Sequence, residues 1–212
     1  MDLMKLPLAV LGIDSNYDPS TEAPYIYRDE EVYPNIRRPL YPVRLRGEDA
    51  TRENVAESAS RPNVRFITGV GHGFEDRFTG DSQGSVFQVG QYDQGEVKNK
   101  LVHFFACETA KRLGPDFMAN GCSAYFGYDE RLLYFTEETV GPEVKTIFAC
   151  DAEIDLLLFQ RKGAIEVFKR TRIKFDEEID RLDSLGMETL AADLKWIRDS
   201  LRLLLAEPEA TL

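Results

Sequence analysis

The chain has 212 residues, of which 43% are hydrophobic and 30% charged, and its formal net charge at pH 7 is -11. This length and composition suit one compact globular domain, or one domain with an appendage, and they exclude a disordered chain. The acidic charge argues against binding to nucleic acid or to an anionic membrane surface, since both select basic proteins. No apolar run is long enough to cross a bilayer.

The cysteine and histidine content limits the chemistry further. Three cysteines are too few, and odd in number, for a disulfide framework, so we expect a reduced, cytoplasmic protein. With two histidines and no Cys-x-x-Cys pair, the sequence predicts no metal site, and we expect no cofactor. The apolar run that begins at Leu6 is short, stops at Asp14 and lacks a cleavage site, which indicates a core strand rather than a signal peptide.

The first half of the chain predicts strands that alternate with helices. Strands are predicted at 6–12, 41–45, 64–70 and 85–89, and a helix from Asp49 or Thr51, either of which can cap it, to Ser60. Residues 14–40 contain four prolines, which predicts irregular structure over the sheet edge. The Gly-rich, acidic stretch 71–84 is predicted as a loop.

The alternation continues into the second half. A buried strand is predicted at 101–106, a helix at 109–120 that ends at Gly121, and a further strand at 123–127. Strands that alternate with helices predict a mostly parallel sheet with helices on its faces.

The composition becomes helical after Pro142. A helix over Val144 to Leu158 is predicted to pack on the sheet, and two apolar stripes then predict an antiparallel hairpin with its turn at Gly186. The stripes comprise Ile165, Phe168, Arg172, Phe175, Ile179 and Leu182, and then Leu190, Leu194, Ile197, Leu201 and Leu204. The hairpin either packs on the core or on itself, or it offers a docking or oligomerisation surface. We therefore predict a domain over 1–160 and a helical hairpin over 161–212 packed on it.

Two strand ends carry residues that suit nucleophilic chemistry. His72 lies between two glycines after the strand 64–70, and Cys107 follows the strand 101–106. Carboxyl ends of parallel strands line the ligand crevice of such a sheet, so the two side chains can meet there. A nearby histidine or a helix N-terminus favours the reactive thiolate, and both are predicted at Cys107. The N–H groups of Gly73 and Cys107 could form an oxyanion hole.

Each of these signals has a plainer interpretation. Gly-His-Gly can be a tight turn, and a free cysteine is often only buried; the two together at neighbouring strand ends favour a site. His103 lies inside an apolar strand and is predicted to be a core histidine with its hydrogen bonds satisfied. Cys122 and Cys150 are predicted to be packing residues.

A set of motifs resembles a known family. The motifs are His72-Gly73, Ala106-Cys107, Leu113-Gly114 and the strand Gly121-Cys122-Ser123-Ala124-Tyr125-Phe126-Gly127-Tyr128. Over about residues 60–130 they resemble the caspase-like superfamily of cysteine peptidases, and within it the prokaryotic CHAT and gingipain-like branches. The resemblance implies a caspase-like three-layer α/β/α sandwich with a mostly parallel sheet. It also implies that His72 is the general base and acid and Cys107 the nucleophile, with no third catalytic acid required.

The specificity pocket departs from that of the animal caspases. Phe105 and Thr109 stand where their Gln-Ala-Cys-x-Gly motif has Gln and Gly, so an Asp-directed pocket is not predicted. The branches that the chain resembles imply cleavage after Arg or Lys. A carboxylate that pairs with such a cation would be Asp129, the first choice, or Glu108 or Asp76.

The expected function is that of a cysteine endopeptidase that cuts a protein or peptide substrate, as a regulated bacterial effector protease with a regulatory protein partner. One alternative is a catalytically inactive caspase-like scaffold that binds a partner through its hairpin. Another is a small-molecule thiol hydrolase, which a deep, narrow pocket would favour over an extended groove.

Overall fold

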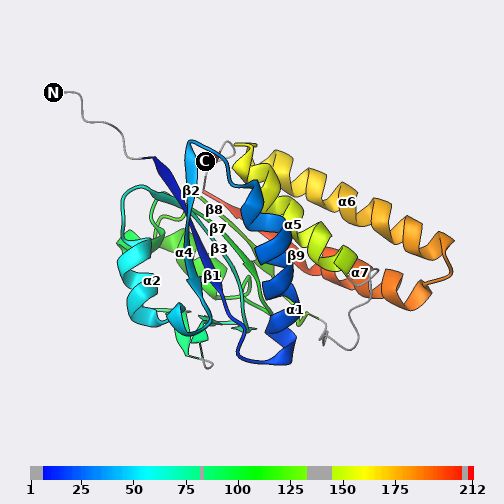
Figure 1. The fold of residues 1–212 in the computed structure, drawn as a ribbon, viewed down its shortest axis with the longest axis horizontal. Coiled ribbons are helices and arrows are strands. Elements are labelled where there is room, and N and C mark those ends of the chain that lie inside the picture. The colour runs from blue at the N-terminus through cyan, green and yellow to red at the C-terminus, as the bar shows by residue number, and fades with distance from the viewer. Residues whose placement is uncertain (1–6, 82–83, 133–144, 207–209) are drawn as a thin grey trace.

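A six-stranded sheet with the order β2-β1-β3-β7-β8-β9 forms the centre of the structure (Figure 1). The strands are β1 Leu8–Asp14, β2 Leu40–Arg46, β3 Val64–Val70, β7 Leu101–Phe105, β8 Ala124–Tyr128 and β9 Leu201–Leu205. Every neighbouring pair is parallel except β8 and β9. The predicted strands of the sheet are therefore confirmed, with their ends moved by one or two residues.

The structure is a computed structural model that describes residues 7–81, 84–132, 145–206 and 210–212. The predictions at Leu6, Pro142 and Val144 lie outside the described residues.

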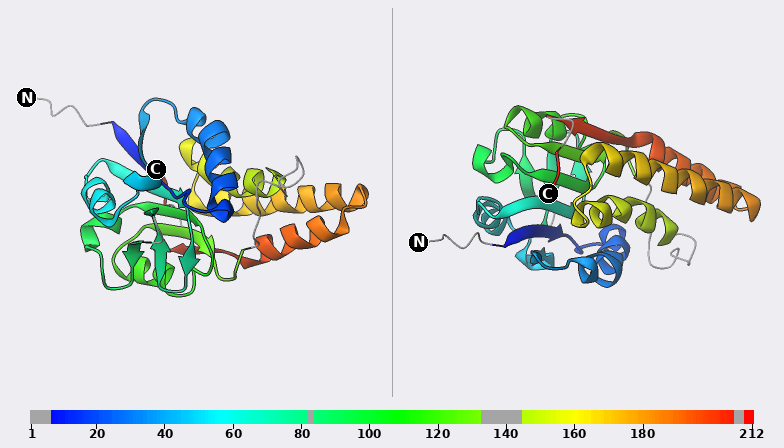
Figure 2. Two further views of the ribbon diagram at one scale, coloured as in Figure 1. Left: turned by 60° about the horizontal axis from the view of Figure 1, so that its bottom comes forward. Right: turned by 90° about the horizontal axis from the view of Figure 1, so that it is seen from above.

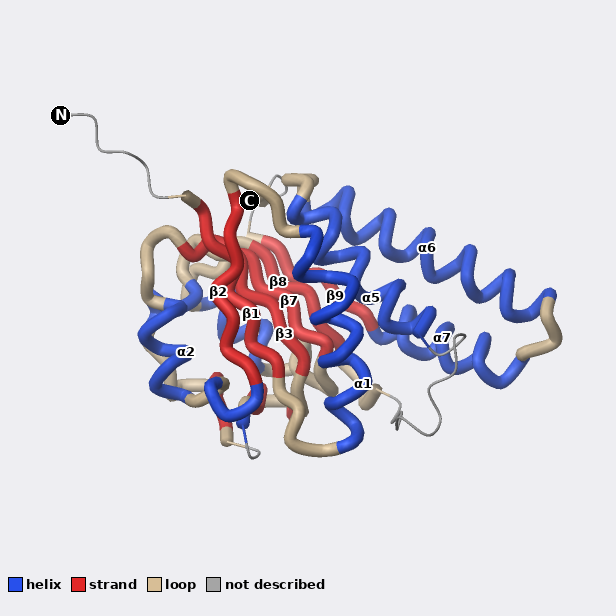
Figure 3. Tube along the Cα trace, viewed as in Figure 1, coloured by secondary structure: helices blue, strands red, loops and turns tan. Residues whose placement is uncertain are grey.

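Helices cover both faces of the sheet (Figure 3). They are α1 Pro19–Tyr27, α2 Arg52–Ala59, α3 Gln94–Val97, α4 Leu113–Ala119, α5 Lys145–Phe159, α6 Ala164–Ser184 and α7 Glu188–Ser200. A small antiparallel sheet consists of β4 Gly73–Phe74, β5 Arg77–Thr79 and β6 Ser85–Gln88, so the predicted loop 71–84 contains two short strands.

The alternation of side chains along each strand produces the three layers. In β7, Leu101 and Phe105 belong to the hydrophobic cluster shared with α1, α5 and the C-terminal helices. Val102 and Phe104 belong to the cluster on the other face, with α2, α4 and the small sheet. Successive residues of a strand point to opposite faces, and a parallel sheet buries both. The predicted three-layer α/β fold is confirmed.

The prediction of irregular structure over 14–40 is wrong in part, because α1 occupies the middle of this segment. Asp18 caps the helix by accepting hydrogen bonds from the N–H groups of Ser20 and Thr21, and Pro19 takes the first helical position. Proline is favoured there, since its fixed φ suits the helix and its missing N–H would have no partner. The proline that indicated a loop therefore helps to start a helix.

The prediction of a helix from residue 109 is also wrong at its start, because α4 begins at Leu113. A helix begun at Thr109 would hold Pro115 in its interior, where the ring clashes with a preceding carbonyl and an N–H is missing. The later start places Pro115 in the first turn. There the ring meets no carbonyl of a preceding helical turn, and an N–H would have had no partner within the helix. At the other end Gly121 follows the helix with a φ of +86°, as predicted.

The predicted helical hairpin is formed by α6 and α7, which extend beyond the sheet (Figure 2). Gly186 lies in its turn with a φ of +72°. Phe175, Leu182 and Leu194 from the two helices are fully buried in the cluster that includes α5 and β8. The apolar stripes thus pack on α5 and on each other, while the division of the chain at residue 160 stays a prediction.

The last residues of the second stripe are not helical, contrary to the prediction. After Ser200 the chain becomes β9, which pairs antiparallel with β8 from Leu201 opposite Tyr128 to Leu205 opposite Ala124. The leucines there fit a helical stripe and a strand equally well, and pairing wins because β8 would otherwise present an unpaired edge. The second helix of the hairpin is consequently followed directly by the last strand of the central sheet.

Candidate active site

His72 and Cys107 come together at the carboxyl ends of β3 and β7. Val70 and Phe105, the last residues of these neighbouring strands, are register partners, and each candidate residue follows its strand by two positions. Both side chains line one cleft of about 90 Å³. The juxtaposition expected from the parallel topology is therefore present, with Cys107 partly buried and the His72 side chain 35% exposed.

The two glycines beside His72 are required by close backbone contacts. A Cβ atom at Gly71 would overlap the carbonyl oxygen of Thr79, and one at Gly73 would overlap the carbonyl oxygen and nitrogen of Cys107. The Thr79 N–H donates to the His72 carbonyl at 2.9 Å, which leaves Gly73 at a non-hydrogen-bonded position of the β4–β5 pair. The two N–H groups predicted for an oxyanion hole thus belong to adjoining backbone segments.

The sequence analysis missed Asp18, which holds the histidine ring. Its Oδ2 lies 2.6 Å from His72 Nε2, and its Oδ1 caps α1 through the Ser20 N–H at 2.9 Å. Burial by itself raises the pKa of the Asp18 carboxyl, but the hydrogen bonds from Ser20 and His72 outweigh it and lower that pKa. An ionised carboxylate only accepts, so Nε2 carries a proton and Nδ1 is the nitrogen left to act as a base.

One signal in the sequence could have identified Asp18. Asp18-Pro19-Ser20-Thr21 has an N-cap residue followed by proline at the first helical position, which is typical of a helix start. This predicts the helix but not its neighbour, because His72 follows more than fifty residues later on another element. Tyr17, the residue before Asp18, also packs against the histidine, with its ring centroid 5.5 Å from that of His72.

The environment of the Cys107 thiol differs from the one expected. Because α4 starts at Leu113 rather than at residue 109, the helix N-terminus does not directly follow the cysteine, and burial raises the pKa of Cys107. The N–H of Leu132, 3.2 Å from Sγ, acts in the opposite direction, since a donor stabilises the thiolate. Glu108, immediately after the cysteine, has a left-handed φ of 58°.

The three carboxylates proposed for a specificity pocket occupy different settings. Asp129 pairs with Arg202 of β9 at 2.7 Å, and Glu108 pairs with Lys111 at 2.8 Å. The hydrogen bond from Lys111 lowers the pKa of Glu108. Asp76, in the turn between β4 and β5, has no ion pair among the described residues. None of the three lines the cleft of His72 and Cys107 as far as the structure describes it.

A second, larger hollow adjoins the first at His72. It has a volume of about 580 Å³ and is lined by Tyr17, Asp18, His72, Phe74, Arg77, Thr79 and Ser85. The guanidinium of Arg77 lies 4.3 Å from the centroid of the half-exposed Phe74 ring. Since His72 borders both hollows, the depression extends from the strand ends towards the small antiparallel sheet rather than forming one narrow pocket.

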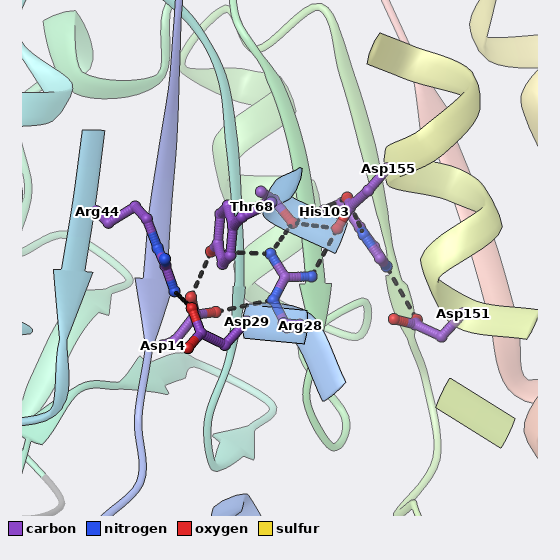
Figure 4. Close-up of polar contacts among 9 residues, drawn as sticks. Asp14, Arg28, Asp29, Arg44, Thr68, His103, Asp151 and Asp155 are labelled. Atoms are coloured by element: carbon purple, nitrogen blue, oxygen red, sulfur yellow. Dashed lines mark hydrogen bonds and ion pairs between the residues drawn. The ribbon is translucent and has the colours of Figure 1, made fainter. Parts of the chain in front are cut away.

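A buried charge network lies beneath the site, on the face of the sheet that α1 and α5 cover. The Arg28 guanidinium donates to Asp14 at 2.8 Å, to Asp155 at 2.6 Å and to the Thr68 hydroxyl at 3.0 Å (Figure 4). These residues come from the end of α1, β1, α5 and β3, and all four are buried. Buried charges are tolerated only when paired in this way.

His103 extends the network and is the satisfied core histidine that the sequence predicts. Its Nδ1 lies 2.8 Å from Asp155 and its Nε2 lies 3.0 Å from Asp151, which also accepts from the Tyr128 hydroxyl at 2.6 Å. Carboxylates only accept, so both ring nitrogens carry protons. Burial alone would lower the pKa of His103, but the two aspartates raise it to about 9.

The network also fixes the position of the acid that holds His72. Arg28 follows the last residue of α1 and ties that end of the helix to the sheet and to α5. Asp18 lies at the other end of the same helix, facing His72. The buried network and the acid that holds His72 are therefore joined by a single helix.

The other two cysteines are poor candidates for reaction. Cys122 and Cys150 are fully buried, and burial raises the pKa of each to about 12. Among the described residues no group of three or more His, Cys, Asp and Glu side chains is placed to hold a metal ion. No helix in the described part of the chain is long and apolar enough to cross a membrane.

Comparison with known proteins identifies the fold. No family model matches the sequence, and no curated protein matches it. The crystal structure of the Arg-specific cysteine proteinase gingipain R (RgpB) superimposes with a TM-score of 0.60 at 12% identity. The complex of the Porphyromonas gingivalis RgpB pro- and mature domains does so with a TM-score of 0.55 at 12% identity. Each alignment covers 98% of this chain and 48% of the other, so the chain spans about half the length of these neighbours. The likeness establishes the caspase-like three-layer α/β fold.

Proposed function

We propose that the protein is a cysteine peptidase in which Cys107 is the nucleophile and His72 the general base and acid. The observation that carries the proposal is the shared cleft of the two side chains at neighbouring strand ends, with the His72 ring held by Asp18 at 2.6 Å. The fold it shares with gingipain R, an Arg-specific cysteine proteinase, supports the same reading. The extended depression favours a peptide over a small-molecule substrate.

The mechanism follows from the positions of these groups. Nδ1 of His72 takes the thiol proton of Cys107 as the sulfur attacks the peptide carbonyl carbon, and the electron pair of the carbonyl moves to its oxygen, where the N–H groups of Gly73 and Cys107 stabilise it. When the carbon–nitrogen bond breaks, the amine takes a proton from Nδ1 of His72. Water then attacks the thioester and gives a proton to His72. When the carbon–sulfur bond breaks, the carboxylic acid product leaves and the sulfur recovers a proton from His72. Asp18 stabilises the imidazolium that forms twice in this cycle.

The proposal is tested with a thiol-directed peptide electrophile and a fluorogenic peptide library. We expect the label to map to Cys107, and Cys107→Ala to lose both the label and turnover. Cys122→Ala is the matched control and should keep both, because that thiol is buried away from the cleft. His72→Ala should lower kcat/KM roughly 10²–10⁴-fold, the usual contribution of general acid–base catalysis. Full turnover in Cys107→Ala would refute the proposal.

A preference for Arg or Lys before the scissile bond is part of the proposal. Asp129 and Glu108 are already neutralised by internal ion pairs, so Asp76 is the candidate carboxylate still free of a cation among the described residues. In the library, a basic preference that Asp76→Asn weakens for Arg substrates, but not for neutral ones, supports this assignment. A preference for Asp or for large apolar residues would overturn it.

One observation favours a second function, a caspase-like scaffold without turnover. Burial raises the pKa of Cys107, whereas an efficient nucleophile needs the opposite shift. In that case the peptide electrophile would label no cysteine of the folded protein, and its proposed regulatory partner would bind wild type and Cys107→Ala equally.

A further inference from the structure

The peptide group between Arg131 and Leu132 is held at both of its polar ends. Its carbonyl oxygen, on Arg131, accepts a hydrogen bond from the indole Nε1 of Trp196 at 3.1 Å. Its N–H, on Leu132, donates to Sγ of Cys107 at 3.2 Å. A peptide group is planar and rigid, so one orientation serves both contacts. Turning the carbonyl away from the indole also turns the N–H away from the sulfur.

Trp196 is unusual among the residues of α7. Its neighbours Leu194 and Ile197 are fully buried, whereas its own side chain is 50% exposed. Packing in the core therefore does not explain its position, and among the described residues its polar contact is the hydrogen bond to the 131–132 peptide. It is also the single tryptophan of the chain.

We propose that Trp196 is a positioning residue that orients the 131–132 peptide so that the Leu132 N–H remains on the Cys107 sulfur. The helical hairpin is thereby coupled to the nucleophile through one peptide group. The proposal rests on the proposed function only in taking Cys107 as the reacting group.

The coupling has a definite chemical consequence. A donor at Sγ stabilises the thiolate more than the thiol, so it opposes the effect of burial on the thiol. Among the described residues, three charged or titratable groups face Cys107. They are His72 across the cleft, Glu108 next to it in the chain, and Arg131, whose carbonyl accepts the hydrogen bond from Trp196. Losing the Leu132 contact removes a hydrogen-bond donor from the thiolate and therefore raises the pKa of Cys107.

The test is the rate of alkylation of Cys107 by iodoacetamide as a function of pH, with the modified cysteine identified by mass spectrometry. Trp196→Phe keeps an aromatic ring and removes the N–H. Its profile should shift to higher pH by about half a unit to one unit, which makes alkylation below the pKa roughly three- to tenfold slower. Leu185→Ala is the matched control, because Leu185 is 60% exposed at the hairpin turn, and its profile should match wild type.

A Trp196→Phe profile that superimposes on wild type, or an equal shift in Leu185→Ala, would overturn the proposal. If Trp196→Phe also lowers the melting temperature, a benzothienyl analogue of tryptophan, with sulfur in place of the N–H, repeats the test without a change of shape. In the reverse direction, alkylation of Cys107 should shift the fluorescence of Trp196, and Cys107→Ser should abolish the shift. An unchanged spectrum on alkylation would also count against the coupling.

These measurements need no peptide turnover. The positioning role can therefore hold in a chain that hydrolyses nothing, and it can fail in one that is a peptidase, so the two proposals are distinguishable.

Discussion

Replacing Asp18 by Asn should lower catalysis while leaving the fold intact. The carboxylate has two roles, since it caps α1 through the N–H groups of Ser20 and Thr21, at 2.9 and 3.3 Å, and holds His72 at 2.6 Å. Asparagine caps helices about as well as aspartate, so the first role survives the change. It carries no charge, so the imidazolium of the proposed reaction would lose its stabilising partner.

The size of the effect follows from the geometry. Hydrogen bonds to charged groups contribute about 1.5–3 kcal/mol, and each 1.36 kcal/mol in a barrier is tenfold in rate, which gives a loss of roughly 10- to 150-fold in kcat/KM. The His72 and Asp18 side chains are 35% and 27% exposed, so water screens the pair. We therefore expect a value towards the lower end, about 10- to 30-fold.

The assay compares kcat/KM on a fluorogenic peptide with the melting temperature of each variant. Glu22→Gln is the matched control, because it removes an acidic charge from the same first turn of α1. Asp18→Ala should lose both the cap and the activity, with destabilisation of about 1 kcal/mol. If Asp18→Asn retains wild-type kcat/KM, or if Glu22→Gln loses as much, the role given to Asp18 is wrong.

Three further predictions concern the supporting structure. Because its pKa is raised from about 6.5 in the unfolded chain to about 9 in the fold, charged His103 contributes stability that is fully present below about pH 6.5 and lost as the pH rises through about 9. Urea unfolding should therefore give a free energy that falls across this window, and a flat profile would contradict the charged state. A chain that ends before Gly163 lacks α6, α7 and β9, and we expect it to aggregate; a soluble product with a cooperative melt would show that the hairpin is dispensable. Gly73→Ala should displace the backbone of Cys107 and slow its alkylation at least tenfold, whereas Gly95→Ala, with open space at its Cβ position, should have no such effect.

The placement of His72 and Cys107 at one edge of the sheet could be predicted from the sequence because it depends on strong local signals. Two apolar runs of strand length, each followed directly by a chemically distinctive residue, imply a shared sheet edge once the strands are parallel. The core histidine and the buried cysteines followed from the same patterns, since residues inside apolar segments are buried whatever the topology. The two apolar stripes of the helical hairpin could also be predicted from the sequence, as far as Ser200.

Other features depend on contacts between segments far apart in the sequence. The cap at Asp18 is a local signal, but its approach to His72 depends on how Arg28 ties α1 to the sheet and to α5. The strand form of 201–205 was decided by the free edge of β8, because leucines at these positions satisfy either periodicity.

The sequence by itself determined the strands, the parallel order that brings His72 and Cys107 to one edge, and most of the helices, because hydrophobic period and turn residues act over a few positions. Only the tertiary structure decided what surrounds the thiol: the start of α4 at Leu113, the burial of Cys107 and the peptide between it and Trp196. Such contacts involve single atoms on separate elements, and their energies depend on distance and burial, which no local pattern of residues encodes.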